Sequence, residues 1–219
     1  MGTLLPLPVF GQATAAHPDI TDRGAVLRVR VHASGDATDA YVRQVVDVAR
    51  ALLAGAGVAT EWAVCVEVAC PIDQVRAASI VVIVEAKGPW EGNRCGRAAL
   101  APVEASGTVR VSVPCVAGVA ERLRQRLDTG SHPMLAMSGH HDLTGAVVAH
   151  EIGHVLGLHH GPTGVMREQL DRNDIISLRS DRLAFSAPDA ATMRRSAERV
   201  IGAPQPALAR LTPGRAATP

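Results

Sequence analysis

Apolar residues recur along the first half of the chain with two different periods, and each period predicts a kind of element. Much of 25–32 is apolar at every second residue, which predicts a strand. One broad apolar face runs through 36–54 at helical spacing, and the glycines that follow predict its end. A second strand is expected at 58–68. A third is expected at 79–85, which is apolar throughout, as strands buried on both faces are. Strand, helix and strand in this order predict a parallel crossover unit.

The second half of the chain predicts a hairpin followed by helices. The glycine-containing segment 104–107 separates two short strands and therefore predicts the hairpin turn. The expected elements are strands at 97–102 and 108–113 and helices at 116–127, 144–156 and 186–201. The stretch 129–141 is expected to be a loop, and 167–184 to be mostly irregular.

The helix expected at 144–156 carries histidines at a spacing that suits a metal ion. His150 and His154 are four residues apart, and residues at that distance share one face of a helix. Both imidazoles can therefore point at one ion. Gly157 falls where a helix can end in a left-handed residue, and a turn there can bring back His160 as a third ligand. Three protein ligands leave the fourth position of zinc open, as in catalytic rather than structural sites.

These histidines also have other interpretations. The helix could be a buried one whose histidines have only structural partners, although five fixed positions match by accident in roughly one of ten thousand chains of this length. His159 could compete with His160 as the third ligand, but the spacing favours His160. His140 and His141 fit no ligand spacing and are expected to be surface or supporting residues.

The stretch from His150 to His160 has the pattern H-E-x-x-H-x-x-G-x-x-H, and Met166 follows six residues later. This pattern, followed by a Met-turn, resembles that of the metzincin zinc peptidases. The resemblance implies one zinc ion held by His150, His154 and His160, with Met166 as a floor beneath them. It also implies peptide-bond hydrolysis, in which Glu151 acts as the general base on a zinc-activated water.

The chain departs from some metzincin families after the third histidine. Arg167 and Glu168 follow the methionine, close to where astacin-like and serralysin-like enzymes have a tyrosine, and the single tyrosine of this chain is Tyr41. The oxyanion would therefore depend on zinc and on backbone donors. Gly161 directly follows the third histidine, where several families have a characteristic residue such as Glu, Pro, Asp or Ser. Small matrixin-like or reprolysin-like bacterial enzymes are the nearest resemblance.

The resemblance implies an α+β fold with a mixed, mostly parallel five-stranded twisted sheet, an active-site helix and a small C-terminal lobe. The Met-turn would begin the lower part of the molecule. The expected divisions are an N-terminal arm at 1–24, a peptidase domain at 25–202 with an upper lobe at 25–160 and a lower lobe at 161–202, and a disordered tail at 203–219.

The short strand at 97–102 is the expected binding site for a substrate backbone. An extended peptide needs partners for its N–H and C=O groups, and a free strand edge supplies them. The strand also resembles the cleft strand of the family. The expected contact residues are Arg97, Ala98, Ala99, Leu100 and Ala101. The alternative is a plain edge strand that Arg97 and Pro102 blunt. The segment 162–169 is expected to form the pocket wall beyond the scissile bond.

The four cysteines raise the question of disulfides. If the hairpin turns about Ala105, Cys95 and Cys115 lie opposite each other, because each is ten residues from the turn. Directly opposed residues are close enough for a disulfide. The alternative is two small apolar residues in a reducing cytosol. The pattern does not place Cys65 and Cys70.

Composition limits the partners of the chain. A net charge of +1 gives no electrostatic case for nucleic acid, and no apolar run approaches a membrane span. The apolar start contains no Lys or Arg and is interrupted by Pro6 and Pro8, which makes it a poor signal peptide. The poor signal peptide favours a cytoplasmic protein, or a secreted one if the cysteines are paired. The resemblance implies a peptide or protein as substrate, and we expect a monomer.

Three functions fit these observations. The first is a zinc metalloendopeptidase. The second is a processing peptidase or amide hydrolase dedicated to one small substrate, which the poor export signal favours. The third is an inactive zinc-binding module, although a site that only binds zinc has no need of Glu151.

Overall fold

The computed structural model describes residues 26–65, 80–87, 94–100, 107–127 and 140–202. The arm expected at 1–24, the hairpin turn expected at 104–107 except for Gly107, and the tail expected at 203–219 lie outside these ranges. Most of the loop expected at 129–141 also lies outside them.

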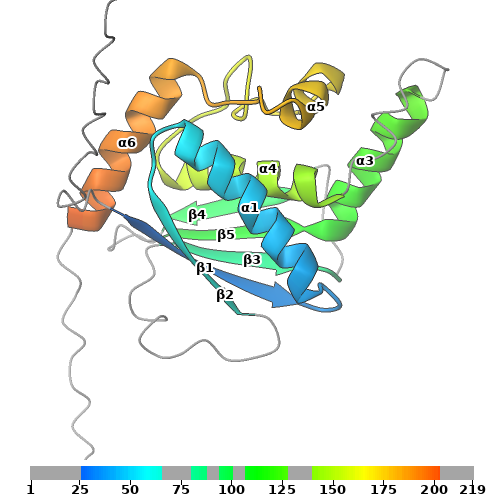
Figure 1. The fold of residues 1–219 in the computed structure, drawn as a ribbon, viewed down its shortest axis with the longest axis horizontal. Coiled ribbons are helices and arrows are strands. Elements are labelled where there is room, and N and C mark those ends of the chain that lie inside the picture. Colours follow the sequence, from blue (N-terminus) through cyan, green and yellow to red (C-terminus); the bar gives the residue numbers. More distant parts are fainter. Residues whose placement is uncertain (1–25, 66–79, 88–93, 101–106, 128–139, 203–219) are drawn as a thin grey trace, which may run out of the picture.

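A mixed sheet forms the base of the molecule (Figure 1). Its strands are β1 (Leu27–Ser34), β2 (Thr60–Cys65), β3 (Ile80–Glu85), β4 (Gly96–Leu100) and β5 (Gly107–Ser112). They form one 5-stranded sheet in the order β2-β1-β3-β5-β4. β1 pairs in parallel with β2 and β3, and β3 with β5, whereas β4 pairs antiparallel with β5. The prediction of a mixed, mostly parallel sheet is confirmed, and β4 is the antiparallel edge among the described strands.

The helices of the described residues are α1 (Asp39–Gly55), α3 (Val113–Leu127), α4 (His140–Val155), α5 (Arg172–Arg179) and α6 (Ala187–Gly202). α1 and α4 pack against each other over the sheet (Figure 1), where the Tyr41 hydroxyl of α1 lies 2.8 Å from Thr144 Oγ1 of α4. None of these helices combines the length and apolar composition that a membrane crossing requires.

The hydrophobic core lies between the sheet and this pair of helices. Alternate residues of the central strands are buried, which is the period that one covered face produces. On β5 this face points at α4, because a Cβ on Gly107 would lie 2.5 Å from Val155 Cγ1. The remaining residues of β3 are only half-buried. The prediction that this strand is buried on both faces is therefore wrong, because α1 and α4 both cover the same face.

The C-terminal part shares this core. Buried side chains between 165 and 197 belong to the same cluster as those of the strands. α6 also closes the end of α1, since Arg194 Nη1 donates to the carbonyl oxygen of Ala56 at 2.8 Å. The division into an upper and a lower lobe stays a prediction.

Two helices begin earlier than the pattern predicts. α4 begins at His140, so His140 and His141 form its first turn rather than the end of a loop. The Thr144 hydroxyl, at the expected start, instead donates to the His140 carbonyl inside the helix at 2.7 Å. α3 begins at Val113, because the Ser112 hydroxyl accepts from the Cys115 N–H at 3.3 Å in the manner of an N-cap.

α5 lies in the stretch 167–184, for which the sequence predicts mostly irregular structure. A capping box starts it: the Asp171 carboxylate accepts from the Asp174 N–H, and the Asp174 carboxylate accepts from the Asp171 N–H. Arg167 pairs with both carboxylates. The helix is short and buries little beyond Ile175, so its apolar period is too brief to be recognised.

The hairpin register differs from the expected one. Gly96 lies opposite Val111, and the Ser112 N–H donates to the Cys95 carbonyl at 2.9 Å. Cys95 is therefore opposite Ser112, and Cys115 is in the first turn of α3.

Candidate active site

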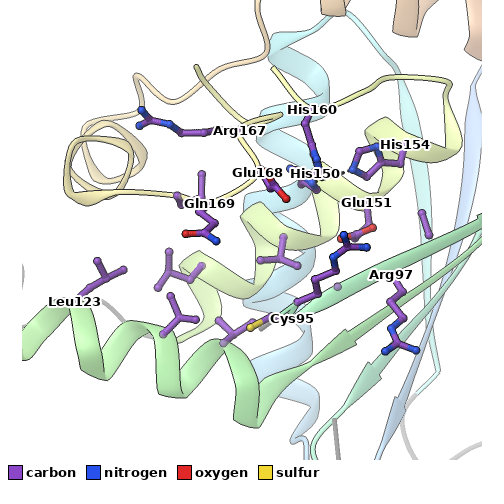
Figure 2. Close-up of a pocket in the computed structure, with 18 of the residues that line it drawn as sticks. Cys95, Arg97, Leu123, His150, Glu151, His154, His160, Arg167, Glu168 and Gln169 are labelled. Carbon is purple, nitrogen blue, oxygen red and sulfur yellow. Dashed lines mark hydrogen bonds between the residues drawn. The ribbon is translucent and has the colours of Figure 1, made fainter. Parts of the chain in front are cut away.

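Three histidines converge at the end of α4 (Figure 2). His150 and His154 lie one turn apart on the helix, and their Nε2 atoms are 3.0 Å apart. One nitrogen from each of His150, His154 and His160 lies within 4.8 Å of the others. Within the part of the chain that the structure describes, this is the group that could hold a metal ion, and His159 is not in it.

The turn after α4 brings the third histidine to the other two. Gly157 has φ of +88°, the left-handed conformation that glycine adopts at little cost, as the sequence predicts. Its N–H donates to the His154 carbonyl at 3.0 Å, and the Leu158 N–H donates to the Gly153 carbonyl at 2.9 Å. These bonds satisfy the last carbonyls of the helix and reverse the chain.

Backbone carbonyls hold the first two imidazoles in one tautomer. His150 Nδ1 lies 2.8 Å from the Val165 oxygen, and His154 Nδ1 lies 2.8 Å from the Leu158 oxygen. A carbonyl oxygen only accepts, so both Nδ1 atoms carry the proton and both Nε2 atoms keep a lone pair for a metal. Burial lowers the pKa of His150 to about 4 and also lowers the pKa of His154, so both rings are neutral at pH 7.

The donor set fits zinc. Neutral imidazole nitrogens are common zinc ligands, and three protein ligands are the number found in catalytic sites. His150, His154 and His160 could bind one zinc ion. This arrangement matches the single zinc site that the spacing of the histidines predicts.

Met166 lies on the inner side of α4, away from solvent. It is fully buried, and its Sδ would be 2.6 Å from a Cβ placed on Gly153, which lies just before His154. The Gly161 N–H donates to the Met166 carbonyl at 2.8 Å and closes the loop after the third histidine. Met166 thus packs beneath the helix that carries two of the histidines.

Glu151 is the acidic residue nearest the histidines in sequence, and it faces the same cleft (Figure 2). Only 7% of the residue is exposed. This burial raises the pKa of the Glu151 carboxyl to about 7, and the positive charge of Arg94 acts in the opposite direction. The side chain is held against β4, since a Cβ on Gly96 would lie 2.3 Å from Glu151 Oε1.

A cleft of about 1260 Å³ contains these groups. Its walls come from the start of β4, from α3, from α4 and from the segment after Met166. Val116, Val119 and Leu123 of α3 face it from one side, and Leu143 and Val147 of α4 extend the apolar lining. From the expected pocket wall at 162–169, Arg167, Glu168 and Gln169 line the cleft (Figure 2).

Only part of the expected substrate strand borders the cleft. Arg97 and Ala98 line it, but the Arg97 side chain points away from the histidines (Figure 2). Leu100 is 66% exposed, and neither it nor Ala99 lines the cleft. Ala101 lies outside the described residues.

Among the described residues, no strand pairs with the outer edge of β4, and this edge presents backbone groups at alternate residues. Cys95 accepts from Ser112 on β5, so in an antiparallel ladder the next pair, Gly96 and Val111, is a non-hydrogen-bonded one. The N–H and C=O groups of Gly96 and Ala98 therefore point away from β5, toward the open side of the sheet. These two residues are also among those that line the cleft.

A disulfide joins the cleft strand to the cleft helix. Cys95, next to β4, is bonded to Cys115 of α3, with Cα atoms 5.2 Å apart. The expected partners are therefore together, although the opposed-strand geometry expected for them is wrong. Cys65 at the end of β2 is also disulfide-bonded.

Sequence reasoning missed several residues that shape the site. The Val165 and Leu158 carbonyls, the α3 wall and Gly96 carry no recognisable motif. Gly96 follows a turn-rich stretch that contains other glycines, so nothing in the pattern sets it apart.

No family model matches the sequence, and no curated protein matches it. Among solved structures, the fold is similar to archaemetzincin from Methanopyrus kandleri, with 15% identity, 80% of this chain and 98% of that chain covered, and a TM-score of 0.48. It is also similar to a zinc-dependent peptidase from Methanocorpusculum labreanum (strain Z), with 15% identity, 75% and 99% covered, and a TM-score of 0.46.

Proposed function

We propose that this chain is a zinc-dependent peptidase of the metzincin kind, with Glu151 as its general base. The observation that carries the proposal is the convergence of His150, His154 and His160 beside a buried carboxyl in an open cleft. A structural zinc site closes all four positions with protein ligands, whereas the described residues supply three here. A site that only bound zinc would also have no use for Glu151.

Each residue of the site has a task in such a hydrolysis. The three histidines would hold the ion, and bound zinc would lower the pKa of a water molecule and polarise the carbonyl of the scissile bond. Glu151 would take the proton of the attacking water and pass it to the leaving amine. The Tyr41 hydroxyl shares a hydrogen bond with Thr144, and Tyr41 does not line the cleft. It therefore cannot take the place of the tyrosine that some families have after the Met-turn.

The edge of β4 would hold the substrate as an added strand. The outward N–H and C=O groups of Gly96 and Ala98 can pair with every second residue of an extended peptide. These groups lie on the same strand that packs against Glu151. A peptide bound there would pass directly beside the proposed base.

The cysteines favour an oxidising compartment for this enzyme. Cys65, Cys95 and Cys115 are all disulfide-bonded, and such bonds persist mainly in secreted or periplasmic proteins. We therefore propose the secreted alternative over the cytoplasmic one. Peptide mapping of protein from its native compartment, without reductant, tests this choice, and a free Cys95 would contradict it.

A mixed peptide library tests the proposed function. Zinc-loaded protein should cleave internal bonds of some library members, and removal of zinc should stop cleavage. Cleavage of a single small substrate only would indicate the dedicated processing enzyme. Stoichiometric zinc without any cleavage would indicate the inactive binding module.

A further inference from the structure

The edge strand of the sheet crosses the proposed base at a glycine. A Cβ built on Gly96 would lie 2.3 Å from Glu151 Oε1, 2.7 Å from its Cγ and 2.8 Å from its Cδ. Real Cβ atoms essentially never come this close to other heavy atoms. The Glu151 side chain therefore occupies the space that any other residue at position 96 would fill.

Space, rather than backbone conformation, is the reason for glycine at this position. Gly96 lies in a strand and is not among the positive-φ glycines. Gly157 is the opposite case, with φ of +88° and nothing within 4 Å of a Cβ. A glycine inside a strand often marks the close approach of another group, and here that group is the Glu151 side chain.

The contact constrains the direction of the carboxyl group. Glu151 leaves α4 beside the histidines, and the backbone of Gly96 closes the space next to it on the β4 side. The residue is only 7% exposed, so close packing surrounds the carboxyl at this place. Because Glu151 is long and flexible, a methyl group at position 96 would move it to another rotamer rather than be tolerated.

We propose that Gly96 is a positioning residue, which holds the Glu151 carboxyl at the metal site by lacking a side chain. This inference rests on the proposed function, because it assigns Gly96 a task in setting the general base. It also gives β4 two tasks at one residue. The Gly96 backbone faces the open edge where a peptide would bind, and its missing side chain makes room for the base.

The kinetic test is Gly96→Ala in the zinc-loaded protein. Displacement of the base should lower kcat about a hundredfold, within the usual contribution of a general base. KM and zinc content should stay close to those of the parent, since the backbone N–H and C=O of position 96 and the three histidines remain. In the Glu151→Gln background the same substitution should cause no further loss of kcat.

The stability test needs no activity. Gly96→Ala should lower the urea midpoint of the metal-free protein when Glu151 is present. In the Glu151→Ala background it should not, because the space is then open. Gly107→Ala is the matched control on the neighbouring strand, where the new Cβ would meet Val155 Cγ1 at 2.5 Å instead. It should lower the midpoint equally in both backgrounds.

The outcomes separate this inference from the proposed function. An equal midpoint loss for Gly96→Ala with and without Glu151 would overturn the positioning role, as would an unchanged kcat. If Gly96→Ala does not fold, recovery of folding in the double variant Gly96→Ala, Glu151→Ala supports the role, and failure to recover contradicts it. If the parent cleaves no peptide, the proposed function is wrong, and the urea comparison still decides whether Gly96 holds Glu151 in place.

Discussion

His150 Nδ1 donates a hydrogen bond to the carbonyl oxygen of Val165, 2.8 Å away, and this bond links the first histidine of the motif to the residue before Met166. The two residues are fifteen positions apart in sequence. The bond therefore orients the ring through the segment that follows the third histidine. A segment outside the three histidines thus helps to set the orientation of one of their rings.

The first prediction separates metal binding from proton transfer. Glu151→Gln should keep about one zinc per chain and lose a factor of about 10² to 10⁴ in kcat, because an amide of the same shape cannot accept the proton of the attacking water. His154→Ala is the companion variant and should lose both zinc and activity. Metal analysis and peptide hydrolysis measure the two effects, and full cleavage by Glu151→Gln would refute the mechanism.

The second prediction concerns the metal-free protein and pH. Burial raises the pKa of the Glu151 carboxyl from 4.5 to about 7, so the folded state holds its proton more tightly than the unfolded state does. The bound proton therefore adds to the free energy of unfolding below pH 4.5, and this contribution is lost as pH rises through about 7. Glu151→Gln removes this loss. The free energy of unfolding of the variant minus that of the parent should therefore rise by about 3 kcal/mol at most from acid to mildly alkaline pH.

Urea unfolding of the two metal-free proteins across this pH range checks the prediction. The pKa of His150 is lowered to about 4, so the neutral ring's contribution to the free energy of unfolding is lost as pH falls through that value. This pH dependence is opposite to that of Glu151. His150 is present in both proteins, and its effect cancels in the comparison. A stability difference that does not change with pH would mean that the Glu151 carboxyl is not buried in the metal-free fold.

The third prediction tests the peptide-binding edge with proline. Ala98→Pro removes an N–H that points away from β5, so the ladder between the strands is kept while one partner for the substrate is lost. KM for peptides should rise about tenfold, the value of roughly one hydrogen bond. Leu100→Pro removes an equivalent outward N–H at a residue that does not line the cleft, and its effect should be smaller. Equal, unchanged KM values in folded variants would show that the substrate lies elsewhere.

The fourth prediction concerns the disulfide between the cleft strand and the cleft helix. Cys95 and Cys115 are 20 positions apart, and a loop of that length corresponds to about 3 kcal/mol of stability in the chain-entropy description. The double variant Cys95→Ala, Cys115→Ala should unfold at correspondingly lower urea. Replacement of both residues leaves the Cys65 disulfide intact, which addition of a reductant would not. Unchanged stability would mean that α3 and β4 are held by packing alone.

The sheet could be predicted from the sequence because its central strands are long, apolar and regular in period. The hairpin register could not, because the sequence 104–107 between the two strands does not favour one position for the turn, and a turn centred away from Ala105 changes every cross-strand pair. α5 was missed for a related reason, since a short helix with polar capping residues offers too few apolar positions to show a period.

The histidine cluster could be predicted because its geometry is local. Helical spacing sets His150 against His154, and one left-handed glycine returns the third histidine. The Val165 carbonyl that holds His150 and the Gly96 backbone that packs against Glu151 come from distant positions, and only the folded chain reveals them. Spacing carries information about neighbours on one element, whereas contacts between elements depend on register and packing.

If a substrate pairs with the outer edge of β4 as proposed, that edge also limits which proteins could be substrates. The strand is 5 residues long, which corresponds to about 17 Å of extended chain. A segment inside a folded protein has its own backbone groups already paired and cannot offer them to Gly96 and Ala98. Binding at such an edge would therefore require local unfolding of the target first, and loops and termini would be cut before stable domains. Susceptibility of a target would then follow the free energy of opening its segment more closely than the identity of the residues around the scissile bond.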